Sequence, residues 1–143
     1  MKKLAADNIP IPLGYGRPIR VLLVEDDPDQ ANLAMAYLNG DRSDLFRVEW
    51  KDNLLNAVSR LAQPGIDVVL LDLGMPDLSG YKTHLAITPV TQKTPVVVLT
   101  ADESAVSKDV TKMQGVFRYL LKQRTSPVEL RQVVHEAALS APL

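Results

Sequence analysis

The chain has 143 residues, of which 46% are hydrophobic and 23% are charged, and its formal net charge is -1. This composition is typical of one globular domain and lacks the basic excess of most nucleic-acid-binding proteins. The sequence has no cysteine and no apolar run near the roughly 20 residues that cross a bilayer. We therefore expect a cytoplasmic protein that binds neither nucleic acid nor membrane and has no thiolate metal site.

The first 18 residues differ in character from the rest of the chain. Residues 1–18 are rich in proline and glycine and show no helical or strand periodicity, so we interpret them as an arm or linker. Residues 19–143 are the predicted domain. It opens with the aliphatic and β-branched run Ile19–Val24, which is typical of a strand buried on both faces.

The first two helices are predicted from capping residues and apolar periodicity. Asp27 can cap a helix whose first helical residue is Pro28, and Asp52 can cap the second helix. The strand between them, at residues 45–50, alternates in a way that leaves one face more exposed. The residues expected on the apolar faces are Leu33, Ala34, Tyr37 and Leu38 in the first helix and Leu54, Leu55, Val58 and Leu61 in the second.

The second half of the chain continues this alternation. An apolar strand runs directly into Asp72, and the last helix starts with a capping box at Ser126 that has Pro127 at the first helical position. The predicted elements are strands at 66–71, 96–100 and 117–121 and helices at 81–88, at 104–113 and from Ser126 onward.

Strands separated by helices predict parallel βαβ units with right-handed crossovers. The expected fold class is α/β, a doubly wound five-stranded parallel sheet with five helices, of the flavodoxin-like kind. Such folds place their site beyond the carboxyl ends of the strands. The polar residues that end the apolar strands should therefore meet at one edge of the sheet: Glu25, Asp26, Asp72, Thr100 and Lys122.

Three carboxylates at one edge repel one another. At a separation of about 6 Å and an effective dielectric near 20, each pair costs roughly 3 kcal/mol, which protonation or a bound cation would relieve. Ligands that are all oxygen suit Mg²⁺. An aspartate can also attack phosphorus, provided that a fixed cation and a hydroxyl or N–H donor stabilise the phosphoryl oxygens. Lys122 and Thr100 are residues of these types.

Taken one at a time, these residues also have simpler interpretations. Asp26 could be a helix cap, Thr100 a strand-end hydroxyl, and Tyr119 a core tyrosine with its hydroxyl at the surface. Only the combination, at the ends of successive strands, favours a phosphoryl-transfer site.

Four segments, at residues 21–27, 67–76, 95–101 and 119–122, together resemble the receiver domains of two-component response regulators. The similarity extends over about residues 19–139. The resemblance implies a role for each site residue: Asp72 as phosphoacceptor, Glu25 and Asp26 as the acidic pair that holds Mg²⁺ or Mn²⁺ together with Asp72 and the backbone carbonyl of Gly74, Thr100 as the switch hydroxyl, Lys122 as the phosphate-binding lysine, and Tyr119 as an aromatic residue that changes rotamer on activation.

The resemblance also implies the domain's partners. It predicts a signalling domain rather than an enzyme, which accepts a phosphoryl group from a histidine kinase or a phosphotransfer protein. Many receivers dimerise through their last two helices and last strand, so we expect a homodimer through this face after phosphorylation.

The chain departs from the family pattern at Gln123, at Gly74 and in residues 81–89, which lack the charged amphipathic pattern common there. Gln123 follows Lys122 where the family usually has proline, and we expect a trans peptide there because a cis bond before glutamine costs about 2.5–4 kcal/mol. Gly74 lacks the polar side chain that many relatives have.

Gly74 also argues against another function, that of a haloacid-dehalogenase-type hydrolase, which has a second aspartate two positions after its nucleophile. A degenerate receiver that is only a binding surface stays open because of Gln123.

Overall fold

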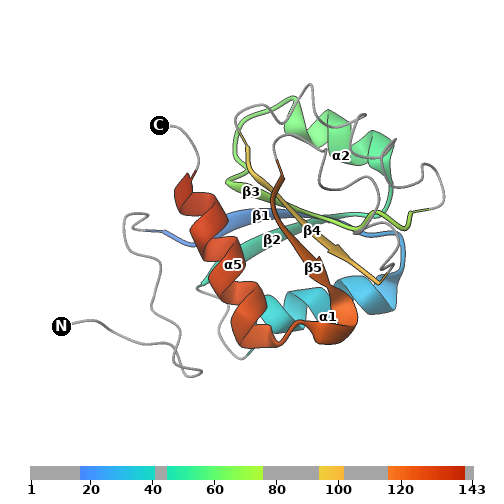
Figure 1. The fold of residues 1–143 in the computed structure, drawn as a ribbon. Helices are drawn as coiled ribbons and strands as arrows, with labels where there is room; N and C mark the ends of the chain where they lie inside the picture. The colour runs from blue at the N-terminus through green and yellow to red at the C-terminus, as the bar shows by residue number, and fades with distance from the viewer. Residues whose placement is uncertain (1–16, 41–44, 76–93, 102–115, 141–143) are drawn as a thin grey trace.

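The computed structural model describes residues 17–40, 45–75, 94–101 and 116–140, which form a parallel sheet with helices on both faces (Figure 1). The order across the five-stranded sheet is β2-β1-β3-β4-β5. The strands are β1 (Ile19–Val24), β2 (Phe46–Lys51), β3 (Val68–Leu71), β4 (Val96–Thr100) and β5 (Val116–Leu121). The helices in this part of the chain are α1 (Pro28–Asn39), α2 (Leu54–Leu61) and α5 (Pro127–Ser140), with a 3₁₀ turn, η3 (Lys122–Arg124).

The predicted α/β class and the five parallel strands are confirmed. The chain runs outward from β1 to the edge strand β2 and then returns to β3 on the other side of β1. This reversal creates the crevice at the carboxyl ends of β1 and β3 where such sheets bind ligands. The predicted helices at 81–88 and 104–113, and residues 1–16 of the predicted arm, lie outside the described residues.

The sheet buries one apolar cluster on each face. Ile19, Val21 and Leu23 of β1 pack on the face that carries α1 and α5, whereas Leu22 and Val24 pack on the face that carries α2. This alternation follows from the opposite directions of successive side chains in a strand. It confirms that β1 is buried on both faces.

The caps agree with the sequence in one helix and differ in the other. The Asp27 side chain accepts hydrogen bonds from the backbone N–H groups of Asp29 and Gln30, with Pro28 at the first helical position, as predicted. The prediction that Asp52 caps α2 is wrong. Asn53 is the cap, and its side chain accepts from the N–H of Asn56 at 2.9 Å.

Two leucines that we predicted on apolar helix faces are exposed. Leu33 of α1 has 48% of its surface exposed and Leu55 of α2 has 75%. Alanines share the inward positions with Leu38 and Leu54, and their small side chains let the helix axes approach the sheet closely. The residues of these helices that are buried are Ala31, Ala34 and Leu38 in α1 and Leu54 and Ala57 in α2.

A buried arginine joins the two helices on one face of the sheet. Arg131 of α5 is only 3% exposed, and its guanidinium donates a hydrogen bond to the backbone carbonyl of Tyr37. This carbonyl lies in the last turn of α1, where helix carbonyls have no partner within the helix and attract cations. Arg131, in α5, therefore caps the C-terminal end of α1.

Within the described residues, no helix combines the length and the apolar character that crossing a bilayer requires.

Candidate functional site

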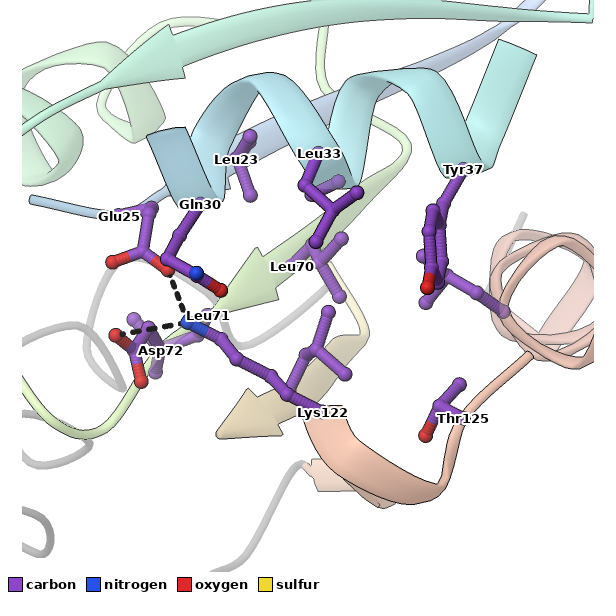
Figure 2. Close-up of a pocket in the computed structure, with 13 residues that line it drawn as sticks. Leu23, Glu25, Gln30, Leu33, Tyr37, Leu70, Leu71, Asp72, Lys122 and Thr125 are labelled. Carbon is purple, nitrogen blue, oxygen red and sulfur yellow. Dashed lines mark hydrogen bonds and ion pairs between the residues drawn. The ribbon is translucent and has the colours of Figure 1, made fainter. Parts of the chain in front are cut away.

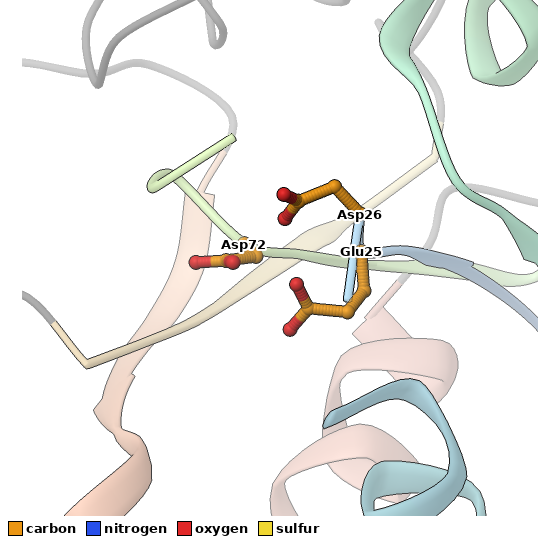
Figure 3. A group of neighbouring side chains, drawn as sticks. All are labelled: Glu25, Asp26 and Asp72. Atoms are coloured by element: carbon orange, nitrogen blue, oxygen red, sulfur yellow. The ribbon is translucent and has the colours of Figure 1, made fainter. Parts of the chain in front are cut away.

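The polar residues that follow β1 and β3 meet at one edge of the sheet, as predicted. The backbone N–H of Asp72 donates to the carbonyl of Val24 at 3.1 Å, which places the end of β3 directly beside the end of β1. Carboxylate oxygens of Glu25, Asp26 and Asp72 all lie within 4.8 Å of one another (Figure 3). Glu25 and Asp72 are buried, whereas Asp26 is exposed, so the cluster opens to solvent on the side of Asp26.

Lys122 brings a positive charge into this cluster from the end of β5 (Figure 2). Its ammonium group donates to a carboxylate oxygen of Glu25 and lies 3.6 Å from Oδ2 of Asp72. The Lys122 side chain is 19% exposed, that of Glu25 4% and that of Asp72 11%. Water screens this arrangement poorly, so the lysine offsets part of the repulsion between the two buried carboxylates.

The environment of Glu25 favours its neutral form. Burial raises the pKa of the Glu25 carboxyl from 4.5 to about 7, against the lowering effect of its hydrogen bond with Lys122, and the nearby Asp72 adds to the increase. Protonation is one of the two ways in which the predicted repulsion could be relieved. A bound cation is the other, and it would compete with the proton.

The remaining predicted site residues lie at or near the same edge. Thr100 is buried at the end of β4 and pairs with Leu121 in the ladder to β5, which places it beside the start of the Lys122 turn. The backbone N–H of Gly74 donates to Oδ1 of Asp72 at 3.0 Å. Tyr119 is half-buried, lies three residues before Lys122, and packs against the apolar cluster on the α2 face of the sheet. Burial raises the pKa of its phenol.

Two hollows adjoin the carboxylates. The first is an open groove above Asp72, and the second is a largely apolar pocket that continues beneath Lys122 between α1 and the turn before α5 (Figure 2). The exposed side chain of Leu33 borders both. The residues that line the groove are Glu25, Asp26, Asp27, Gln30, Leu33, Asp72, Ala101, Lys122 and Gln123.

The described residues contain no cis peptide bond, which agrees with the expected trans peptide before Gln123. The Gln123 side-chain amide donates to the carbonyl of Ala101 at 3.3 Å and so bridges the ends of β4 and β5.

The carboxylate cluster fits a small cation that prefers oxygen ligands. Mg²⁺ is bound by carboxylate oxygens about 2.1 Å away and usually keeps several waters. One oxygen from each of the three carboxylates lies within 4.8 Å of the other two, so small rotations of these side chains would bring all three to one ion. The cluster includes no imidazole or thiolate, so its chemistry favours Mg²⁺ or Mn²⁺ over zinc.

One residue beside the cluster was not singled out from the sequence. The indole N–H of Trp50, in β2, donates to the backbone carbonyl of Glu25 at 2.7 Å. This contact depends on the register between β1 and β2, and a single sequence contains no signal for that register.

Comparisons with known proteins point to one family. The family model described as "Response regulator receiver domain" matches residues 21–135. The transcriptional regulatory protein TrcR of Mycobacterium tuberculosis is 31% identical over 119 residues, which cover 83% of this chain and 44% of that protein. The histidine-protein kinase BarA of Escherichia coli is 34% identical over 105 residues, which are 71% of this chain and 11% of the kinase. The chain thus spans less than half the length of either relative.

A solved structure has the same fold and a metal at its site. The receiver domain of the sensor histidine kinase PA1611 from Pseudomonas aeruginosa superimposes with a TM-score of 0.70 at 26% identity, covering 86% of this chain and 99% of that one. That structure has a magnesium ion coordinated in its active-site cleft.

Proposed function

Because this chain belongs to the response regulator receiver domain family, we propose that Asp72 accepts a phosphoryl group in a site that Glu25, Asp26 and Lys122 complete. The observation that carries the proposal is the convergence of three carboxylates and one lysine from the ends of three strands. A haloacid-dehalogenase-type hydrolase would need a carboxylate at position 74, where this chain has glycine. Signalling through a phosphorylated aspartate is therefore the function that fits this site.

Each residue of the site has a role in the proposed phosphoryl transfer. A carboxylate oxygen of Asp72 attacks the phosphorus atom, and the bond from phosphorus to the donor nitrogen breaks as the new P–O bond forms. Lys122 already lies 3.6 Å from Asp72 and would turn from Glu25 to a phosphoryl oxygen. Thr100, at the same edge, would donate its hydroxyl to another phosphoryl oxygen.

Glu25, Asp26, Asp72 and the carbonyl of Gly74 would hold Mg²⁺ or Mn²⁺. When bound, the cation supplies neutralisation of charge on the transferring phosphoryl group. Before transfer, two features reduce the repulsion between the buried carboxylates of Glu25 and Asp72. The raised pKa of Glu25 favours its neutral form, and Lys122 donates a hydrogen bond to it.

The phosphodonor in this proposal is a histidine kinase or a phosphotransfer protein. A stretch of the histidine-protein kinase BarA and the receiver domain of the sensor histidine kinase PA1611 are similar to this chain. The donor would approach Asp72 along the open groove, where it would meet the exposed side chain of Leu33. We also propose that phosphorylation moves Thr100 and Tyr119 and promotes a homodimer through the last strand and the last two helices. Sedimentation with and without a phosphoryl mimic would test the dimer.

Phosphorylation from a small-molecule donor tests the proposal directly. The protein is incubated with acetyl phosphate and Mg²⁺, and its intact mass is measured. We expect one phosphoryl adduct on the wild-type protein and none on Asp72→Asn. Asp29→Asn, which changes an exposed aspartate outside the carboxylate cluster, should be phosphorylated like the wild type. An adduct that persists in Asp72→Asn would remove Asp72 from this role.

A further inference from the structure

We propose that Trp50 is a positioning residue for the metal site: its indole N–H holds the peptide unit that joins Glu25 to Asp26. The inference rests on the proposed cation site. The hydrogen bond from the Trp50 indole to the Glu25 carbonyl is 2.7 Å long and is partly shielded from water. It is therefore a short, well-formed contact between the edge strand β2 and the acidic pair.

The Glu25 carbonyl lies at the point where the sheet no longer supplies partners. The ladder between β1 and β2 ends with the pair Val24 and Lys51, and the N–H of Glu25 still donates to the Lys51 carbonyl at 3.1 Å. The carbonyl of Glu25 lies beyond this last pair. A partly buried carbonyl needs a donor, and the Trp50 side chain takes the place of the missing ladder bond.

This contact matters because Glu25 and Asp26 must depart from strand geometry. In a regular strand, successive side chains point to opposite faces of the sheet. Here the carboxylates of Glu25 and Asp26 both point toward Asp72 (Figure 3). The peptide unit between these residues sets the directions of both side chains. Bonds from β2 to the N–H and to the carbonyl of Glu25 fix the backbone on both sides of that residue.

The sequence makes this contact accessible to an isosteric test. Trp50 is the only tryptophan in the chain, so replacing tryptophan with 3-benzothienylalanine during expression changes this position alone. That analogue has sulfur in place of the indole N–H and nearly the same shape. We expect its Kd for Mg²⁺, measured by calorimetry, to rise about three- to tenfold, which corresponds to the loss of one hydrogen bond. Trp50→Phe should show the same change.

Val48→Ala is the matched control for packing. Val48 lies two residues before Trp50 on the same strand and packs against the same apolar cluster. We expect Val48→Ala to lower the melting temperature and to leave the Kd for Mg²⁺ unchanged. The wild-type protein provides a second readout, since tryptophan emission should change on titration with Mg²⁺ and stay constant in an Asp26→Ala variant.

The possible outcomes separate the two proposals. If the wild-type protein binds Mg²⁺ and the benzothienyl protein binds it equally well, Trp50 is not a positioning residue and the metal site stands. If the Kd rises equally in Val48→Ala, the effect belongs to packing, and the inference is wrong. If the wild-type protein binds no Mg²⁺, the metal site and the inference fail together.

Discussion

Lys122 donates a hydrogen bond to Glu25, a residue 97 positions earlier in the chain. Its distance to Asp72, the proposed phosphoacceptor, is longer, at 3.6 Å. The lysine is thus held beside Asp72 by a second acid, at the end of a different strand. Phosphorylation would have to compete with this pair for the ammonium group, so the protonation state of Glu25 should influence the stability and the chemistry of the site.

The raised pKa of Glu25 predicts that the metal-free protein loses stability as the pH rises. In the unfolded chain Glu25 titrates near 4.5, whereas burial raises its pKa to about 7 in the folded protein. Between these values the folded state holds a proton that the unfolded state has lost. The contribution is therefore complete below pH 4.5 and disappears as the pH rises through 7. It amounts to at most about 3 kcal/mol.

Urea unfolding at several pH values between about 5 and 8, without divalent cations, measures this slope. Glu25→Gln should flatten it, because glutamine cannot titrate. His135, whose pKa is lowered by burial, contributes the opposite slope to both proteins and cancels in the difference between them. Equal slopes in the wild type and in Glu25→Gln would contradict the assignment.

We expect Mg²⁺ to stabilise the fold near neutral pH. At ten times its dissociation constant, a bound ion adds about 1.4 kcal/mol, which should raise the melting temperature by roughly 3–5 °C. Asp26→Ala should abolish the increase. Asp29→Ala, at an exposed aspartate in the first turn of α1, should preserve it. A thermal shift that is the same in Asp26→Ala and in the wild type would place the ion elsewhere.

The lifetime of the phosphorylated state should depend on position 74. Hydrolysis needs a water molecule aligned with the bond that breaks, and glycine has no side chain to hold one. A Cβ atom added at Gly74 would lie 3.5 Å from Oδ1 of Asp72, which is an ordinary contact. Gly74→Asn should therefore fold and should dephosphorylate several-fold faster, which corresponds to about 1 kcal/mol.

The decay of the phosphorylated protein after removal of the donor gives the rate for Gly74→Asn. Gly74→Ala is the control, since it adds the Cβ atom without a polar group and should decay at the wild-type rate. Decay of Gly74→Asn at that rate or more slowly would show that another group positions the water.

Replacing Leu33 should slow phosphoryl transfer from a partner protein but not from a small-molecule donor. It is 48% exposed and borders the groove above Asp72. Leu33→Ala should reduce the kcat/KM for transfer from a phosphorylated partner about tenfold, the size of a modest interface contact, and leave the rate with acetyl phosphate unchanged. Leu55→Ala, which removes an exposed leucine from α2 on the other face of the sheet, should change neither rate.

The sequence predicted the parts of the fold that depend on buried strands. Apolar runs that end in acids identified the positions of Glu25 and Asp72, and parallel topology then implied that they share an edge. The helix faces were harder. Leu33 and Ala34 both fit a helical repeat, and only the packing of α1 on the sheet decides that the alanine turns inward.

Other features depend on contacts that a single sequence does not encode locally. Asp52 and Asn53 are both good capping residues, so the choice between them depends on where α2 meets the sheet. The partner of Trp50 depends on strand register, and the pairing of Lys122 with Glu25 depends on how far each side chain extends. The sequence could therefore locate the site but could not assign its hydrogen bonds.

The buried guanidinium of Arg131 has a consequence for the way the domain opens. Separating α5 from α1 would break the hydrogen bond that the Arg131 guanidinium donates to the carbonyl of Tyr37. A small opening would break this bond before water could fully hydrate the carbonyl and the guanidinium. The amides of α1 and α5 should therefore exchange with deuterium as one cooperative unit, and a local fluctuation that frees only one of the two helices should be rare.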